Sequence, residues 1–165
     1  MAQQQPSSGW QGPPPEPGPA PGVAFAGFGA RLVAYIIDVI VVGVVTSVIV
    51  LVGVAVALAG AINDSAGVAV IGALFIALAV IVVMLAYFPW FWARSGATPG
   101  MQAMGIMVVR DADGGPVSGS QAVLRLIGYW VSGAVFYLGY IWIFVDPRRR
   151  GWHDLIAGTV VIRTP

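Results

Sequence analysis

Two long apolar stretches, separated by a short polar turn, set the strongest limit on how this chain can fold. Residues 28 to 62 contain only two charged side chains, Arg31 and Asp38, and residues 67 to 92 contain none. A helix rises about 1.5 Å per residue, so each stretch can cross a hydrocarbon core of about 30 Å. With 58% hydrophobic and 9% charged residues, the chain has too little polar surface for an ordinary water-exposed fold. The sequence therefore predicts an all-α membrane protein with at least two transmembrane helices in a lipid bilayer.

The chain before the first helix has a different character. Residues 1–24 are rich in Gln, Pro, Gly and Ser, with too few apolar side chains to offset the entropy lost on ordering. We expect a disordered tail there, able to recruit a cytoplasmic partner, followed by one membrane domain over residues 25–165. No basic residue precedes a short apolar run, so the tail does not resemble a signal peptide.

A third apolar stretch, residues 126–145, carries no charge and predicts a helical segment over about 120–145. Three full crossings would divide the eight arginines evenly between the two sides, against the usual excess of positive charge in the cytoplasm. We therefore favour a re-entrant or interfacial segment, broken near Ser132-Gly133 or Gly139, and a third span remains the alternative. In the favoured arrangement the N-terminus is cytoplasmic.

Shorter patterns predict further contacts. Small residues recur every four positions in both long stretches, and these stripes either face each other in a close hairpin or simply reflect abundant alanine. β-branched residues near 105–110 and 158–163 predict short cytoplasmic strands that could pair. The segment Asp111-Ala112-Asp113-Gly114 predicts a turn, because the twelfth position of a calcium loop would be Ala122 instead of Glu. The two stripes are Gly53, Ala57 and Ala61, and Ala69, Ala73 and Ala77.

Asp38 needs an explanation, because a carboxylate inside a spanning helix costs at least a few kcal/mol unless it is paired, hydrated or protonated. Arg31 lies on the same helical face, about 10 Å away along the axis, and Arg125 would enter the membrane from the same side. We predict a charge cluster of Arg31, Asp38 and Arg125, with Asp154 as a second acid at the boundary. Such a cluster could respond to protons or cations, or could be a fixed ion-pair lock.

Catalysis and cofactor chemistry find little support. The chain has no cysteine and one histidine, and His153 beside Asp154 has no accompanying nucleophile or oxyanion arrangement. A metal site would need more ligands than these, and a net charge of +1 gives no case for nucleic acid. We therefore expect no enzyme activity, no metal and no cofactor.

Three ordered motifs, spread over residues 27–164, resemble the RDD family of membrane proteins. The first runs from Arg31 to Asp38. The second is Thr98-Pro99-Gly100, although Met101 stands where family members often have a basic residue. The third contains Asp146, Arg148, His153, Asp154, Gly158 and Thr159. The resemblance implies a multi-pass protein of the bacterial inner membrane, for which transport is often suggested.

Two functions remain open after this reading. The first is a transporter-like unit for a proton, cation or small ligand, which would be a homo-oligomer because two helices and a partial third cannot enclose a pathway. The second is a non-transporting membrane adaptor or scaffold, in which the charged cluster only holds the fold.

Overall fold

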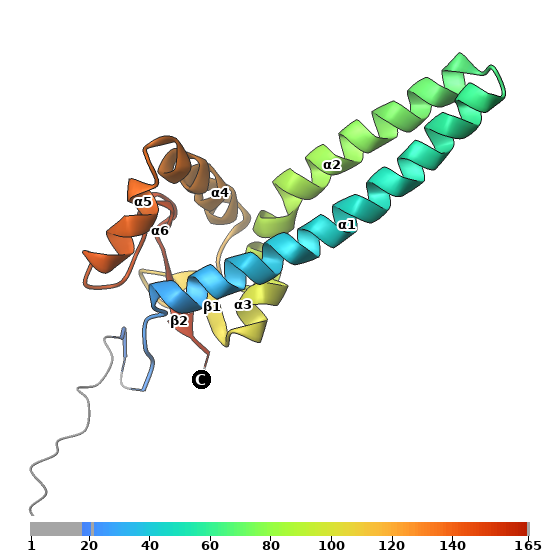
Figure 1. Ribbon diagram of the computed structural model, residues 1–165. Helices are drawn as coiled ribbons and strands as arrows, with labels where there is room; N and C mark the ends of the chain where they lie inside the picture. The colour runs from blue at the N-terminus through green and yellow to red at the C-terminus, as the bar shows by residue number, and fades with distance from the viewer. Residues whose placement is uncertain (1–17, 21, 165) are drawn as a thin grey trace, which may run out of the picture.

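The two long apolar stretches form an antiparallel helical hairpin that projects from a small compact module (Figure 1). The computed structural model describes residues 18–20 and 22–164. Helix α1 spans Phe28–Ile62 and α2 spans Ala66–Ser95. The side-chain amide of Asn63 donates to the Ala59 carbonyl (2.7 Å) where α1 ends, and Gly96, with φ at 72°, ends α2 in the left-handed region.

The hairpin is closed by small residues. Gly72 lies against the backbone of Ala57 and the carbonyl of Gly53, so that a Cβ at position 72 would sit 2.7 Å from the Ala57 nitrogen. Along the same interface, Gly60 of α1 lies against Ala69 of α2, and Gly53 of α1 lies against Gly72 and Ile76 of α2. Close packing of the predicted kind is present, but Ala61, Ala73 and Ala77 are exposed because the contact alternates steps of three and four along each helix.

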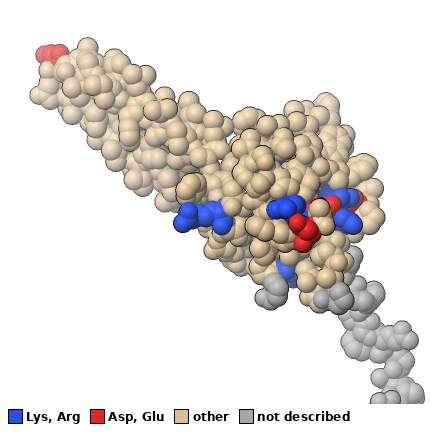
Figure 2. All heavy atoms as spheres, turned by 180° about the vertical axis from the view of Figure 1, so that it is seen from behind, with Lys and Arg blue, Asp and Glu red and all other residues tan. Residues whose placement is uncertain are grey.

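Both hairpin helices have the length and composition of membrane spans. Only 11% of the most apolar window of α1 and 6% of that of α2 is buried inside the protein, so these side chains need lipid around them. Figure 2 shows acidic atoms at the far tip of the hairpin, where Asp64 lies, and the arginines at the opposite end. The chain is thus a multi-pass membrane protein suited to a lipid bilayer.

The third apolar segment is sharply bent. It consists of α4 (Gly119–Ala134), α5 (Leu138–Ile141) and a 3-10 turn, η1 (Trp142–Phe144), with an angle of 111° between the two halves. The break falls between the two predicted positions, at Phe136 and Tyr137, whose φ angles are 50° and 61°. By length and composition, the two halves of the bent segment, residues 119–134 and 138–144, form either a broken span or a re-entrant loop.

A two-stranded sheet brings the ends of this segment together. Strand β1 (Ile106–Arg110) pairs antiparallel with β2 (Thr159–Arg163), which confirms the predicted strands and their pairing. The chain before α1 adds to the free side of β2, where Ala26 N–H donates to the Val161 carbonyl (2.9 Å). Because β1 precedes the bent segment and β2 follows it, both its ends lie at the base of the hairpin.

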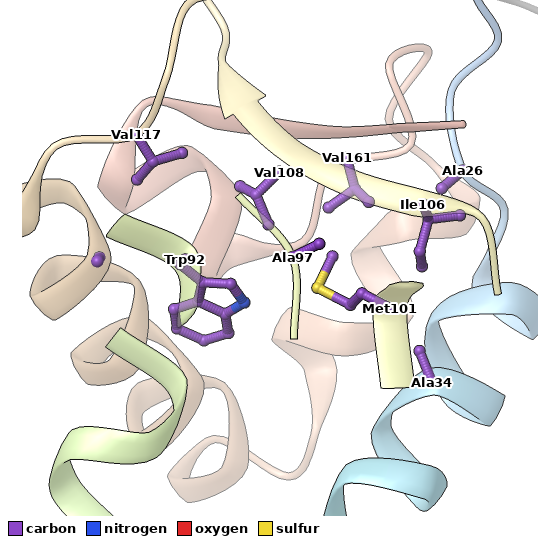
Figure 3. Packing of buried hydrophobic residues seen from close by; sticks show 10 residues of the cluster. Ala26, Ala34, Trp92, Ala97, Met101, Ile106, Val108, Val117 and Val161 are labelled. Atoms are coloured by element: carbon purple, nitrogen blue, oxygen red, sulfur yellow. The ribbon is translucent and has the colours of Figure 1, made fainter. Parts of the chain in front are cut away.

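The core of the module lies under this sheet. Figure 3 shows Val108, Val161 and Ile106 pointing from the strands toward Ala97, Met101 and Trp92. Two short helices, α3 (Pro99–Ala103) and α6 (Trp152–Ala157), complete the module. Residues 1–17 and 21 of the predicted tail lie outside the described part of the chain.

Candidate functional site

Two buried acids lie where α1 enters the module, and they have different partners. Asp154, on the first turn of α6, is fully buried, and Asp38, inside α1, is 2% exposed. The structure brings Arg31 and Arg125 to Asp154, and neither contacts Asp38 as an ion pair. The predicted residues therefore gather in one region but divide into two sites.

Asp154 is held between two arginines. Arg31 Nη1 donates to one carboxylate oxygen at 2.6 Å, Arg125 Nη1 donates to the other, and the Gly151 N–H adds a third bond at 3.0 Å. Burial alone would raise the pKa of Asp154, but the two guanidinium charges outweigh it and hold that pKa below its usual value. The acid is therefore ionised throughout the physiological range.

The two arginines are themselves anchored. Arg31 also donates from Nε to the Ala26 carbonyl (3.1 Å) and from Nη2 to the Arg149 carbonyl (2.6 Å). Arg125 donates to Thr159 Oγ1 (2.7 Å), and its guanidinium lies 4.9 Å from the centre of the Trp92 ring. The arginine pair thus ties α1 and α4 to α6 and β2.

Asp38 is surrounded by neutral donors. The Thr98 hydroxyl (2.5 Å), the Gly100 N–H (2.8 Å) and the Tyr87 hydroxyl (2.9 Å) all donate to its carboxylate. Within residues 18–20 and 22–164, no arginine lies within ion-pair distance of it. The physical reason is position, because Arg31 stands about two turns nearer the helix end, beside α6.

The Thr-Pro-Gly motif explains how these donors reach the helix interior. Thr98 caps α3, accepting a bond from Met101 N–H (3.2 Å), while Pro99 occupies the first helical position. A Cβ at Gly100 would collide with the Ala34 carbonyl of α1, so only glycine permits the approach. The motif is therefore a docking device that presents donors to Asp38.

A small cavity of about 30 Å³ separates the two sites. Its lining includes Asp38 and Thr98 as well as Arg31 and Arg125. Trp92 also lines it, and both Trp92 Nε1 and Arg125 Nε are buried donors with no hydrogen-bond partner among the described residues. Space of this size, with several polar groups around it, is enough for a water molecule.

A larger pocket of about 360 Å³ lies on the other side of Arg31. His153 forms part of its wall and is 2% exposed. Its ring stacks on Tyr129, with centroids 4.1 Å apart, and the pocket is otherwise mainly aromatic. Burial, reinforced by Arg125 and Arg31 and opposed by Asp154, lowers the pKa of His153 from 6.5 to about 3, so the imidazole is neutral.

The remaining motif residues serve the outer face of the module. Asp146 accepts from Arg150 Nε (2.9 Å) and Nη2 (3.0 Å), and Arg148 bridges to Asp111 (2.7 Å). Gly158, with φ at 62°, ends α6 in the left-handed region before β2. This surface network is separate from the two buried acids.

Sequence reasoning missed the aromatic partners. Tyr87 is one of several aromatic residues at the end of α2, and no polar pattern distinguishes it there, or Tyr129 and Tyr140 within the third apolar stretch. A buried acid on the facing helix is the one signal that could have identified Tyr87. Among the described residues, no group of three or more His, Cys, Asp or Glu side chains could hold a metal ion.

Comparison with known proteins agrees with the motifs. The family model described as "RDD family" matches residues 25–158. An uncharacterized Bacillus subtilis (strain 168) protein, YxaI, is 31% identical over 147 residues, which cover 83% of this chain and 96% of the relative. No solved structure matches.

Proposed function

The chain belongs to the RDD family, and on this premise we propose that it is a transporter-like unit that moves protons across the bacterial inner membrane. The observation that carries the proposal is Asp38, a buried carboxylate within a spanning helix that has three neutral donors and, in the described part of the chain, no ion-pair partner. Acids inside a spanning helix are rare in membrane proteins and commonly mark a proton or ion pathway.

The surroundings of Asp38 favour a proton over a metal cation. The small cavity beside it is also lined by Arg31 and Arg125, whose two positive charges exceed the single negative charge of Asp154. The carboxylate of Asp38 only balances this excess, so the cavity offers a metal cation no net negative charge. A water molecule in the cavity would connect Asp38 with the arginine pair and carry the proton.

The arginines support a defined orientation. All eight lie on elements at the base of the hairpin, and Asp64 lies in the turn at its tip. Positive charge is concentrated on the cytoplasmic side of inner-membrane proteins, so the module and the N-terminus are cytoplasmic in this proposal. The bent third segment then enters from the cytoplasm and returns to it.

A hairpin alone encloses no pathway, so transport requires copies of the chain to assemble. The exposed faces of α1 and α2 are the surfaces available for a homo-oligomer within the bilayer. The proton path in this assembly would run from the module, past Asp38, to the outer half of the hairpin.

The competing function is a non-transporting adaptor or scaffold. Hydrogen-bond donors surround both acids, three at Asp154 and three at Asp38. This arrangement is expected of a fixed structural lock and favours the adaptor. In that function the N-terminal tail binds a cytoplasmic partner, and the charges never exchange protons.

Proteoliposomes separate these functions. Asp38→Asn keeps the size of the side chain but cannot be ionised, so proton flux driven by a pH gradient should fall at least about tenfold, the effect of about 1.4 kcal/mol, while thermal stability changes little. Asp113→Asn is the matched control, because its side chain is 54% exposed and its contacts, with Arg110 and the Gly115 N–H, lie at the surface. An absence of flux in the unmodified protein, with Asp38→Asn destabilised, would support the adaptor.

A further inference from the structure

The larger pocket opens from the side of the hairpin toward the surrounding lipid. Its cavity of about 360 Å³ lies between the start of α1 and the short helix α5 (Figure 1). Leu32 and Tyr35 on α1 and Ile141 on α5 line it and are 44%, 49% and 52% exposed. These α1 side chains continue the exposed apolar face formed by Ile36 and Val39. Hydrocarbon from the bilayer can therefore enter the pocket sideways, without passing through water.

The interior of this pocket is suited to hydrocarbon, because its charged and basic groups are engaged or enclosed. Each of the three guanidinium nitrogens of Arg31 already donates to an acceptor. Both ring nitrogens of His153 are closed to solvent, with Nδ1 against the glycine before α6 and Nε2 beside Asp154. The remaining lining is aromatic and aliphatic. A polar ligand would lose its hydrogen bonds to water there, whereas an acyl chain has none to lose.

The start of α1 lies at the depth of the lipid headgroups. Its 35 residues extend over about 52 Å, whereas a bilayer measures about 40–45 Å with its headgroup regions included. A tilted α1 whose outer end reaches the far headgroups therefore has its first turn among the near ones. Leu32 lies about 7.5 Å along the helix axis from Gly27, at 1.5 Å per residue. The mouth of the pocket is thus at the level where acyl chains begin.

A cation without an acidic partner stands beside this first turn. A Cβ at Gly27 would sit 3.4 Å from Arg149 Nη1, the same distance at which this nitrogen donates to the Phe25 carbonyl. The two neighbours of Arg149 in the chain both pair with Asp111, whereas in the described part of the chain Arg149 pairs with no carboxylate. Its own carbonyl accepts from Arg31 Nη2 (2.6 Å), which fixes its position next to the pocket. A guanidinium in this place is complementary to a phosphate.

We propose that this cleft binds one anionic phospholipid, with its phosphate at Arg149 and one acyl chain inside the aromatic pocket. The glycerol lies over Phe28 and Phe144, whose ring centroids are 4.9 Å apart, and the chain passes between Leu32 and Ile141. The second chain stays in the bilayer. A zwitterionic lipid binds less well, because its own ammonium group offsets the charge of the phosphate.

Native mass spectrometry of the full-length protein tests the headgroup. The protein would be released from micelles that contain equal amounts of phosphatidylglycerol and phosphatidylcholine with the same acyl chains. Single-lipid adducts should favour phosphatidylglycerol about fivefold, the effect of about 1 kcal/mol for one arginine near an anionic surface. An excess of glycerol phosphate, which has the phosphate without the acyl chains, should leave the lipid in place.

Paired arginine variants locate the phosphate. Arg149→Gln should remove the preference for phosphatidylglycerol, and Arg149→Lys, which keeps the charge, should retain it. Arg94→Gln is the matched control, because Arg94 also has no carboxylate partner in the described part of the chain. Its guanidinium lies 5.6 Å from the centre of the Trp90 ring on α2, and α2 does not line the pocket. This control should keep the full preference.

Paired leucine variants locate the acyl chain. Leu32→Trp fills the mouth of the pocket and should lower the retention of both lipids at least about fivefold by steric exclusion. Leu51→Trp is its control, a leucine on the same helix that is 69% exposed and is not part of the pocket lining. It should retain both lipids as the unmodified protein does.

Four outcomes would overturn the proposal. Equal adducts of the two lipids on the unmodified protein would show that no anionic headgroup is selected. Equal loss of the preference in Arg149→Gln and Arg94→Gln would indicate attraction to the whole basic end of the hairpin. Unchanged retention in Leu32→Trp, or displacement by glycerol phosphate, would show that no acyl chain occupies the pocket. Lipid binding needs no proton gradient, so the result is independent of whether the protein transports protons.

Discussion

The outer half of the hairpin and the module at its base are held together in opposite ways. Beyond Val42, the buried positions of α1 are Gly53 and Gly60, and the outer part of α2 has Gly72. The module instead buries charged and polar side chains, among them Asp38, Arg125 and Asp154. The outer half depends on close backbone approach and surrounding lipid, whereas the module depends on buried charge pairs and the hydrogen bonds to its two acids. Substitutions should therefore act through charge in one region and through shape in the other.

The largest effect is expected from Asp154→Asn. The variant keeps the shape of the side chain but leaves Arg31 and Arg125 facing each other without a negative charge, which should destabilise the module by about 3–5 kcal/mol. Denaturant titration with tryptophan fluorescence would measure the change. Arg110→Gln breaks an exposed pair with Asp113 and an exposed bond to the Pro116 carbonyl, and the loss should stay within about 1 kcal/mol. Similar losses of unfolding free energy in the two variants would show that the buried ion pairs of Asp154 contribute little to stability.

A smaller effect should follow from Gly72→Val in the outer hairpin. The new side chain would meet the Ala57 backbone and force the helices apart, costing about 1–3 kcal/mol. Gly67→Val, on the same helix, has nothing within 4 Å of its Cβ position and controls for the change in residue type. Unfolding in mixed detergent micelles would compare the two. Equal stabilities would mean that the hairpin does not need close contact at position 72.

The smallest effect is a pH dependence from His153. Its pKa is lowered to about 3 in the folded protein, so between pH 6.5 and 3 the unfolded chain binds more protons than the folded one. Stability should therefore fall as pH decreases below 6.5, by up to about 1.4 kcal/mol per pH unit. Thermal unfolding from pH 7.5 to 5 avoids most carboxylate titration, and His153→Phe should flatten the slope. An unchanged slope in that variant would assign the dependence to other groups.

The same contrast explains what could be predicted from sequence. The helix over residues 28–62 follows from hydropathy alone and has the observed bounds. Helix α2 runs on to Ser95, because Pro89 does not break it and the left-handed Gly96 does end it. Helix length and strand composition are local properties, which is why they were predictable.

The partners of the acids were less accessible. From the sequence alone Arg31 could pair with either acid, and only the position of α6, which packs on α4, brings Asp154 to it. The donors to Asp38 come from Tyr87 and from the loop at Thr98, and their contribution depends on how closely Gly100 approaches α1. Which side chain binds which acid depends on the complete fold. The sequence therefore predicted the charged residues of the cluster but not how they pair.

The separation of Arg31 and Asp154 along the chain has a consequence for biosynthesis. They are 123 positions apart, so when the hairpin leaves the ribosome, the acid that neutralises Arg31 has not yet been made. Asp38 meets its donors earlier, since Thr98 and Gly100 directly follow α2. The nascent protein must therefore keep Arg31 hydrated at the membrane surface until α6 arrives.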